Sequence, residues 1–276
     1  MAEPIILVTG STDGIGKATA RALVLGGAEV ILHGRDKKKG EAVRREVAEA
    51  AGSGTPDLVV GDYTRHTDIH RIAADLASRY SRLDVLVNDA GTYQKTRQVT
   101  ADGIEVTFAV NYLGPFLLTR LLLPLLRKSP AARIVTVASS AHEDVDRIEW
   151  DNLPGLRRYD PWKAYALSKF ADVSFTYTLA RNLRGSAVTA NCLHPGVVNT
   201  KILRTAFPGM AAITPEEGAR TPVYLARSPE VAGISGRFFE NQRPVRSSAL
   251  SHDRNVQERL WRLGEELTGL AGRDEM

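Results

Sequence analysis

The segment IILVTGSTDGIG, residues 5–16, sets a short apolar run directly before a glycine-rich turn. The apolar run is typical of a buried strand, and a helical pattern follows from residue 14 to residue 26. Gly10 permits a tight turn, Gly14 lets the backbone approach a bound group, and Gly16 allows close packing between helix and sheet. A strand, a glycine turn and a helix in this order predict the opening unit of an α/β fold.

Strands and helices continue to alternate along the chain. We expect strands at 5–9, 28–34, 57–62, 83–89, 132–140 and 187–196, and helices at 14–26, 36–51, 65–79, 103–127 and 161–184. The strands are apolar nearly throughout, as in parallel sheets that helices cover on both faces. A helix near 215–227, a strand at 236–240 and a helix from about 254 complete the pattern. The sequence predicts one α/β domain over residues 1–276, with a doubly wound parallel sheet.

The bulk composition excludes several kinds of protein. Of 276 residues, 36 are basic and 32 are acidic, and a net charge of +4 is too small to indicate nucleic-acid binding. The single cysteine, Cys192, rules out an internal disulfide framework and fits a reducing compartment. The apolar stretch 111–128 is interrupted by Pro115, Arg120 and Pro124, which favours a buried helix over a membrane span. We expect a soluble, cytoplasmic protein without a secretory signal or a membrane partner.

The turn at 9–16 also predicts a ligand. The first N–H groups of a helix and its dipole favour a phosphate, so this turn is expected to hold the pyrophosphate of a dinucleotide. The residues assigned to this contact are Gly10, Ser11, Thr12, Gly14, Ile15 and Gly16. Any tight turn needs glycines, but the position directly after the first strand favours dinucleotide binding.

The end of the second strand distinguishes between two dinucleotides. A carboxylate there would bind the ribose of NAD, whereas this chain has Arg35, whose planar guanidinium suits the 2′-phosphate of NADP. The alternative is that Arg35 is only a surface charge, and Asp13 in the glycine turn does not help a phosphate. Asp36 is expected to cap the next helix. Asp62, at the end of the third strand, is expected either to bind adenine or to begin a helix, and Tyr63 beside it is assigned to the cofactor.

The stretch YDPWKAYALSKF, residues 159–170, contains two tyrosine–lysine pairs at helical spacing. Asp160, followed by a proline, is typical of a helix N-cap, so Tyr159 lies before the helix and the spacing of the first pair has no helical meaning. Tyr165 and Lys169 lie one turn apart on one face. A neighbouring ammonium stabilises a tyrosinate, so Tyr165 is the candidate acid or base for hydride transfer between a nicotinamide and a carbonyl or alcohol.

Two further polar positions belong to this hypothesis. Ser140 ends the fifth strand in TVASS and is expected to hydrogen-bond a developing alkoxide, with Ser139 as its competitor. Asn111 lies in an otherwise apolar helix, where a water chain to Lys169 would satisfy its amide. Each position alone is also compatible with a structural role, the serine in a turn and the asparagine at a helix kink.

Taken together, these residues resemble a known family. The matching segments are TGSTDGIG, NDAG at 88–91, Asn111, Ser140, Tyr165-x-x-x-Lys169 and PGVVNT at 195–200. They are similar to the motifs of the short-chain dehydrogenase/reductases, and the resemblance covers nearly the whole chain. Arg35, HPGVVNT and the C-terminal LWRLGEELTGL resemble the retinol-dehydrogenase-like carbonyl reductases within that family.

The resemblance implies roles for individual residues. The catalytic set would be Asn111, Ser140, Tyr165 and Lys169, with the second of the paired serines chosen on the family's pattern. The cofactor would be bordered by Asn88, Ala90, Gly91, Pro195 and Gly196, with Val198 and Thr200 at the nicotinamide carboxamide and Lys169 and Tyr165 at the ribose and ring. Two departures from the family's pattern are Asp89, where asparagine is usual, and Asp13, where many NADP-preferring members carry a basic residue.

The implied function is an NADP-dependent oxidoreductase acting on a hydrophobic ketone, aldehyde or secondary alcohol. Long loops at about 141–160 and 197–214 are expected to form the substrate walls. Apolar side chains in or beside them favour an apolar pocket, namely Tyr93, Trp150, Trp162, Phe207 and Met210. The alternatives are an NAD-dependent alcohol dehydrogenase and a non-catalytic NADP-sensing regulatory protein.

Two expectations concern metals and partners. His66 and His70 could share a helix face, but no third ligand is evident, so no metal site is expected. Relatives often pair through the helices that correspond to 103–127 and 161–184, so a homo-oligomer is an expectation from the resemblance.

Overall fold

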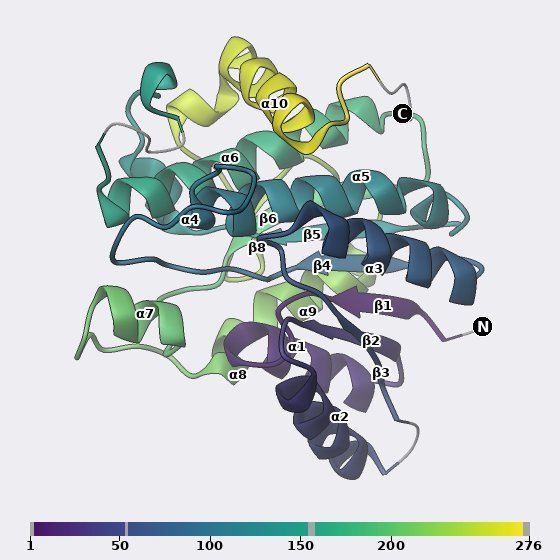
Figure 1. Ribbon diagram of the computed structural model, residues 1–276. Coiled ribbons are helices and arrows are strands. Elements are labelled where there is room, and N and C mark those ends of the chain that lie inside the picture. Colours follow the sequence, from purple (N-terminus) through teal and green to yellow (C-terminus); the bar gives the residue numbers. More distant parts are fainter. Residues whose placement is uncertain (1–2, 53–54, 154–157, 273–276) are drawn as a thin grey trace.

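Eight strands form one sheet in the order β3-β2-β1-β4-β5-β6-β7-β8 in the computed structural model, which describes residues 3–52, 55–153 and 158–272. Strands β1 to β7 are parallel, and β8 pairs antiparallel with β7. Helices cover both faces of this sheet (Figure 1). The chain leaves β1 outward to β2 and β3 and then returns to β4 on the other side. This confirms the predicted doubly wound fold.

The strands are β1 (Ile5–Val8), β2 (Glu29–Gly34), β3 (Asp57–Val60), β4 (Val85–Asn88), β5 (Arg133–Val137), β6 (Thr189–His194), β7 (Phe238–Glu240) and β8 (Arg243–Val245). The helices are α1 (Gly14–Leu25), α2 (Lys37–Ala51), α3 (His66–Arg79), α4 (Val106–Phe108), α5 (Gly114–Leu126), α6 (Pro161–Asn182), α7 (Lys201–Ala206), α8 (Pro215–Gly218), α9 (Arg220–Arg227) and α10 (Arg254–Thr268). A π-helical turn, Ala109–Leu113, joins α4 to α5.

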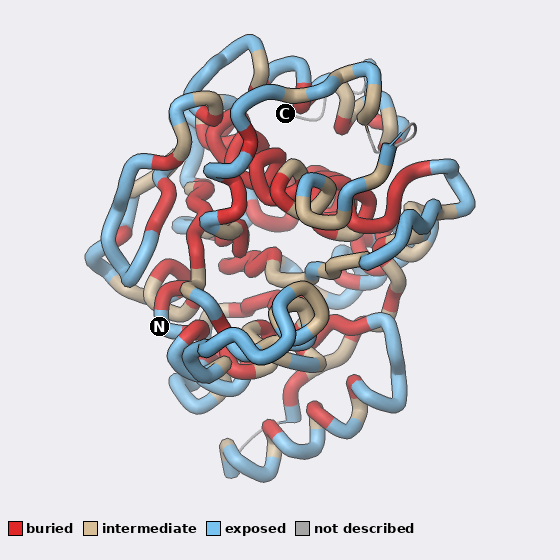
Figure 2. The backbone as a smooth tube through the Cα atoms, turned by 90° about the vertical axis from the view of Figure 1, so that its left-hand side faces the viewer, coloured by how far each residue is buried: buried red, intermediate tan, exposed pale blue. Residues whose placement is uncertain are grey.

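Alternate residues of the central strands enter two different cores. Ile5 and Leu7 of β1 belong to the core under α3, α5 and α6, whereas Ile6 and Val8 belong to the core under α1, α2 and α9. Figure 2 shows these buried residues concentrated in the middle of the molecule. A strand covered on both faces has no polar side, which explains the apolar runs of the sequence.

Three segments differ from the predicted elements. The hairpin partner β8 was missed, because it is a three-residue edge strand, joined to β7 through Asn241 and Gln242 with φ values of 49° and 64°. Such positive φ values are typical of tight hairpin turns. The helix expected at 103–127 begins only at Val106 and contains the π-helical turn. The loop expected at 197–214 contains the short helix α7.

Helix α10 packs across α5 and α6 (Figure 1). The Trp261 ring lies 5.0 Å from the Phe116 ring and 5.8 Å from the Phe175 ring, and Arg120 forms a 2.8 Å ion pair with Glu265. The helices through which pairing was expected are therefore partly covered by the chain's own C-terminal helix.

The continuous helical stretch Val106–Leu126 is long and apolar enough to cross a membrane by length and composition alone. In this fold 89% of its most apolar window is buried inside the protein, between the sheet, α3 and α6. Core helices of packed domains have the same character, so this stretch by itself is weak evidence for a membrane span.

Candidate active site

A cavity of about 540 Å³ runs along the carboxyl ends of the parallel strands. It begins at the glycine turn after β1 and ends at Tyr165 and the loop around α7. Open α/β sheets bind ligands at this edge, where the strand order reverses. The predicted residues that line it are Gly10, Thr12, Gly14, Ile15, Arg35, Asp62, Tyr63, Ala90, Gly91, Ser140, Tyr165, Lys169, Pro195, Gly196, Val198 and Thr200. Four other predicted residues, Ser11, Gly16, Asn88 and Asn111, lie behind its surface.

Close backbone packing explains two glycines of the turn. Gly10 has a φ of 68°, and a Cβ atom on it would lie 2.7 Å from the Cα atom of Ala90. A Cβ atom on Gly16 would lie 2.6 Å from a side-chain oxygen of Asp89. The predicted close packing of α1 at Gly16 is confirmed. Ser11 is buried and exchanges hydrogen bonds with the backbone of His33, so it ties the turn to β2 rather than facing the cavity.

His33 is a residue of the site that the sequence analysis missed. Its Nδ1 accepts from the N–H of Gly10 at 3.3 Å, and its Nε2 lies 3.2 Å from the carbonyl oxygen of Gly61, so Nε2 carries the proton. Burial lowers the pKa of His33 to about 4, which keeps the ring neutral. The ring braces the glycine turn from β2. A histidine inside an apolar strand was the available signal.

Asp62 and Tyr63 line the cavity and also make contacts within the protein. The carboxylate of Asp62 accepts from the N–H of Thr64 at 2.9 Å, which is the turn-forming role of the two that were predicted. Tyr63 is buried, and its ring stacks on His33 at 4.8 Å between centroids. Behind the cavity, Asn88 donates to the hydroxyl of Thr119 at 3.0 Å and so ties β4 to α5.

One end of the cavity is basic. Arg35 is exposed there and forms no ion pair within the described residues, while Asp36 caps α2 by accepting from the N–H of Lys39, as predicted. The Lys39 ammonium lies 2.8 Å from the carboxylate of Asp13, and this hydrogen bond lowers the pKa of Asp13. Lys39 therefore neutralises the aspartate that was expected to disfavour a phosphate.

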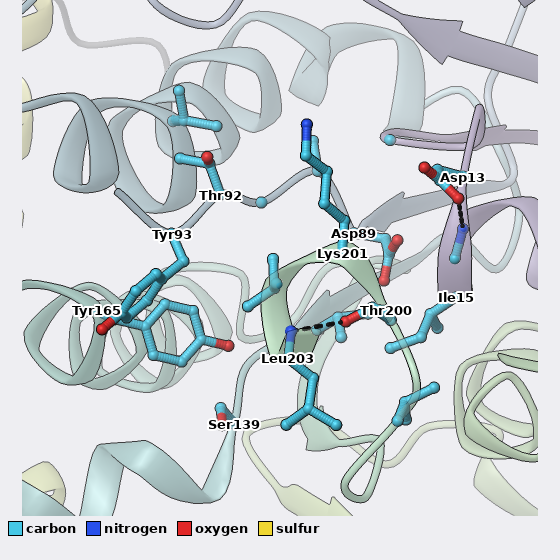
Figure 3. Close-up of a pocket in the computed structure, with 18 of the residues that line it drawn as sticks. Asp13, Ile15, Asp89, Thr92, Tyr93, Ser139, Tyr165, Thr200, Lys201 and Leu203 are labelled. Carbon is cyan, nitrogen blue, oxygen red and sulfur yellow. Dashed lines mark hydrogen bonds between the residues drawn. The ribbon is translucent and has the colours of Figure 1, made fainter. Parts of the chain in front are cut away.

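The other end of the cavity holds Tyr165, which projects into it from the first half of α6 beside Ser139 (Figure 3). Ser139 lies beside Tyr165 and opposes the rise of its pKa, and the Ser139 side chain accepts from the N–H of Ala141 at 3.2 Å. The placement of Ser140 beside the tyrosine is therefore corrected to Ser139. β5 ends at Val137, three residues before the predicted end at 140, and the turn that follows presents Ser139 to the cavity.

Ser140 has a different contact. Its backbone N–H donates to Nδ1 of His194, at the end of β6, at 3.2 Å, and its side chain is exposed. Burial lowers the pKa of His194, so the ring is available as a neutral acceptor. His194 thus fixes the turn that presents Ser139.

Lys169 lines the cavity one turn after Tyr165, and its ammonium is held by two acceptors within the protein. Its ammonium donates to the carbonyl oxygen of Val137 at 2.8 Å and to Asp172 at 3.0 Å. Burial raises the pKa of Tyr165, and the opposing effects of Lys169 and Ser139 do not reverse this shift. In this state Tyr165 is a neutral phenol rather than a tyrosinate.

Asn111 lies in the π-helical turn between α4 and α5. Its amide donates to the carbonyl oxygen of Thr92 at 3.0 Å and to the hydroxyl of Ser168 at 2.9 Å, and it accepts from the N–H of Thr92 at 2.7 Å. The side chain therefore joins the loop after β4 to α6, which carries Tyr165. The amide of Asn111 is thus satisfied by protein groups, and the predicted water chain to Lys169 stays a prediction. π-helical turns inside α-helices are frequent at functional sites.

The first tyrosine of the 159–170 stretch is separate from this site. Asp160 caps α6 by accepting from the N–H of Lys163 at 2.9 Å, as predicted. Tyr159 lies before the helix, and its hydroxyl donates to the carbonyl oxygen of Gln94 at 2.7 Å. Of the two tyrosines, only Tyr165 lines the cavity.

Aromatic side chains surround Tyr165. The Tyr93 ring lies 5.9 Å and the Trp162 ring 5.8 Å from it, and Phe207 packs against Trp162 at 5.2 Å. These residues and Met210 line the cavity as expected, with Phe207 and Met210 largely exposed. Trp150 does not line it and instead packs under the guanidinium of Arg259 at 4.0 Å, which corrects that assignment. Positions 154–157 of the expected loop 141–160 lie outside the described residues.

The loop after β6 closes the cavity over the glycine turn. Val198 pairs with Ile213, and Thr200 caps α7 by accepting from the N–H of Leu203 at 3.3 Å (Figure 3). The Thr200 side chain lies close to Gly14, where an added Cβ atom would meet its methyl group at 3.2 Å. The loop 197–214 thus spans both ends of the cavity.

Metal-binding and thiol chemistry find no support at this site. Within the ranges 3–52, 55–153 and 158–272, histidine, cysteine, aspartate and glutamate side chains form no group of three or more that could hold a metal ion. Cys192 is fully buried in β6, and burial raises the pKa of its thiol, which confirms it as a core residue.

A family comparison identifies the class of protein. The model of the short chain dehydrogenase family matches residues 4–211, so the chain belongs to this family. Retinol dehydrogenase 14 of Homo sapiens is 38% identical over 96% of this chain and 86% of its own length. Polyprenol dehydrogenase of Homo sapiens is 36% identical over 97% of this chain and 86% of its own length. The chain is therefore a short-chain oxidoreductase with retinol-dehydrogenase-like relatives.

A solved structure extends this comparison to the cofactor. A short chain dehydrogenase from Shigella flexneri, complexed with NADP, is 28% identical and covers 88% of this chain and 98% of its own, with a TM-score of 0.74. The family uses NAD or NADP. The residues present fit such a group, because Gly10 and Gly14 leave the helix N-terminus open and the cavity reaches Tyr165.

Proposed function

We propose that the protein is an NADP(H)-dependent oxidoreductase that interconverts a hydrophobic ketone or aldehyde and the matching alcohol. The observation that carries this proposal is the placement of Tyr165 beside Ser139 at one end of a continuous cavity whose other end carries Arg35 and Lys39. When bound, the nicotinamide cofactor supplies or accepts the hydride.

The protein's own residues handle the proton. In reduction, the Tyr165 hydroxyl donates its proton to the carbonyl oxygen, and Ser139 donates a hydrogen bond to the same oxygen as negative charge develops there. In oxidation, the same two groups act in reverse. The raised pKa of Tyr165 favours the donor role, because the phenol holds its proton at neutral pH. Asn111 keeps α6 and the loop after β4 in register, and so holds Tyr165 in place.

The choice of NADP rests on charge. Arg35 and Lys39 lie at the end of the cavity where a 2′-phosphate would lie, and Lys39 pairs with the carboxylate of Asp13. A structural relative that was solved with NADP supports this choice. NAD remains the alternative cofactor, and a comparison of the two dissociation constants distinguishes them.

The substrate class rests on the aromatic surroundings of Tyr165 and on the relatives. Tyr93, Trp162 and Phe207 form an apolar entrance to the reacting end of the cavity. The names of the relatives indicate action on retinol and polyprenol, which are hydrophobic alcohols. We further propose that the protein works in a reducing compartment such as the cytoplasm, because its single cysteine is buried in the core.

The test is a panel of ketones and aldehydes followed by NADPH absorbance, with matched tyrosine variants. Tyr165→Phe should lower kcat by about 100-fold or more, since general acid catalysis contributes about that much. Its dissociation constant for NADPH should stay unchanged. Tyr159→Phe is the control and should keep normal turnover, because Tyr159 does not line the cavity and its hydroxyl donates to the Gln94 backbone. NADPH binding without turnover of any compound would contradict the proposal and favour a regulatory protein.

A further inference from the structure

Lys169 and Asp172 form a buried ion pair one turn apart on α6. The ammonium lies 3.0 Å from Oδ2 of Asp172 and 2.8 Å from the carbonyl oxygen of Val137, and the two side chains are 7% and 1% exposed. The ammonium is therefore held at the end of β5 by two acceptors.

The fold alone does not require a carboxylate at this position. Burying an ion pair costs desolvation energy, and apolar residues of similar volume often serve equally well. Oδ1 of Asp172 is buried and makes no hydrogen bond within the part of the chain that the structure describes. An unpaired oxygen adds to the cost. Such a group next to Lys169, which lines the cavity, indicates a role at the site rather than in folding.

We propose that Asp172 is a positioning residue, which holds the Lys169 ammonium against β5 and thereby limits its action on the Tyr165 hydroxyl. This inference rests on the proposed function, in which Tyr165 transfers the proton. While the pair is intact, its two charges largely cancel at the distance of Tyr165. Without the carboxylate, an uncompensated ammonium would remain one turn from the phenol and would favour the tyrosinate.

The surroundings leave this ion pair as the main source of charge. Burial raises the pKa of Asp172 to about 6 against the opposing effect of Lys169, so the carboxylate is ionised at neutral pH. Tyr112 from the π-helical turn and Cys192 from β6 also face Asp172, and burial raises both of their pKa values, so both stay neutral. Asp89, beyond Lys169, is mostly protonated at neutral pH, because burial raises its pKa to about 8.

The test is the ionisation of Tyr165, followed as tyrosinate absorbance with the Tyr165→Phe protein subtracted as background. In Asp172→Asn, the apparent pKa of Tyr165 should fall by on the order of one unit relative to the unmodified protein. Ser174→Ala is the matched control, since Ser174 is an uncharged, fully buried neighbour on α6. It should leave the titration unchanged. An unchanged Tyr165 pKa in folded Asp172→Asn would overturn the proposal.

A double-mutant cycle shows whether Asp172 acts through Lys169. In a Lys169→Met background, Asp172 loses its cation and should take up a proton, so the further change Asp172→Asn should have little effect on Tyr165. An equal effect in both backgrounds would mean that the carboxylate acts directly on Tyr165, which rejects a positioning role.

The experiment separates this inference from the proposed function. The titration needs no turnover, so a protein inactive towards every carbonyl would contradict the function and leave the titration result valid. Asp172→Ser removes the same charge with a smaller side chain and serves if Asp172→Asn does not fold. If the enzyme is active, kcat/KM for alcohol oxidation can be measured against pH. The acid limb of this pH profile should move to lower pH in Asp172→Asn and Asp172→Ser.

Discussion

The two ends of the cavity are built in different ways. The basic end lies within one βαβ unit. It is formed by the glycine turn of residues 9–16 and by residues 33–39, which run from the end of β2 into α2. Its contacts include a hydrogen bond from the Gly10 N–H to His33, the Asp36 cap and the ion pair of Lys39 with Asp13. The reacting end draws on four different elements of the fold: Thr92 follows β4, Ser139 follows β5, Tyr165 lies in α6 and His194 ends β6. A contiguous segment fixes its own geometry, whereas a site assembled from distant loops depends on where each strand ends.

The largest expected effect lies at the reacting end and compares the adjacent serines. Ser139→Ala should lower kcat for carbonyl reduction by about 100-fold or more, because it removes a hydrogen-bond donor to the reacting oxygen. Ser140→Ala should keep nearly normal kcat, since the Ser140 side chain is exposed and the variant retains the backbone N–H that donates to His194. Steady-state kinetics with NADPH and the best carbonyl of the panel measure both effects.

Melting temperatures are the control for both serine variants, because Ser139 also caps a 3-10 turn. A stable Ser139→Ala protein with normal kcat, together with a slow Ser140→Ala protein, would restore the original choice of Ser140.

This serine pair shows where prediction from the sequence stopped. The alternation of strands and helices, the N-caps Asp36 and Asp160 and the packing role of Gly16 follow from local rules, and the structure confirms them. The choice between Ser139 and Ser140 depends on the residue at which β5 ends, and such boundaries are uncertain by one or two residues. Nothing local to the sequence indicates it.

Long-range contacts explain the other misses. The roles of His33 and Lys169 come from contacts with Gly10, Gly61 and Val137, which lie 23, 28 and 32 positions away along the chain. Trp150 stands in a loop near the site, yet its ring packs on Arg259 of α10. Sequence distance to a motif is therefore a poor guide to which loop side chains enter a cavity.

An intermediate effect is expected at the basic end. Arg35→Asp should weaken NADPH binding by about 10-fold or more and leave NADH binding equal or tighter, because a carboxylate repels the 2′-phosphate and suits a free ribose. Lys38→Asp is the matched control, since Lys38 is an exposed lysine of the same basic segment that does not line the cavity. Dissociation constants from fluorescence titration measure the change. Equal losses for both dinucleotides in Arg35→Asp would contradict the assignment of NADP.

The smallest expected effect lies where the two ends meet, at Asp89, which contacts the Gly16 region on one side and acts on Lys169 on the other. Burial raises the pKa of Asp89 from 3.8 to about 8, against the effects of Lys169 and of the Gly16 N–H. Between these values the folded protein holds a proton that the unfolded chain releases. The contribution of Asp89 to the folding stability of the protein therefore falls as the pH rises from about 4 to about 8.

Asp89→Asn removes this titration, so its melting temperature relative to the unmodified protein should rise between about pH 4 and pH 8 and level off above, by a few degrees in total. Asp84→Asn is a control of opposite sign. Hydrogen bonds from Ser129 and from the N–H of Ile5 outweigh burial and lower the pKa of Asp84, so its removal should cost stability at neutral pH and little at low pH. Parallel pH curves for Asp89→Asn and the unmodified protein would show that Asp89 is ionised throughout. Asp89 would then be a buried negative charge between the two ends of the cavity. The proposed cancellation of the Lys169 and Asp172 charges at Tyr165 would have to include this third charge.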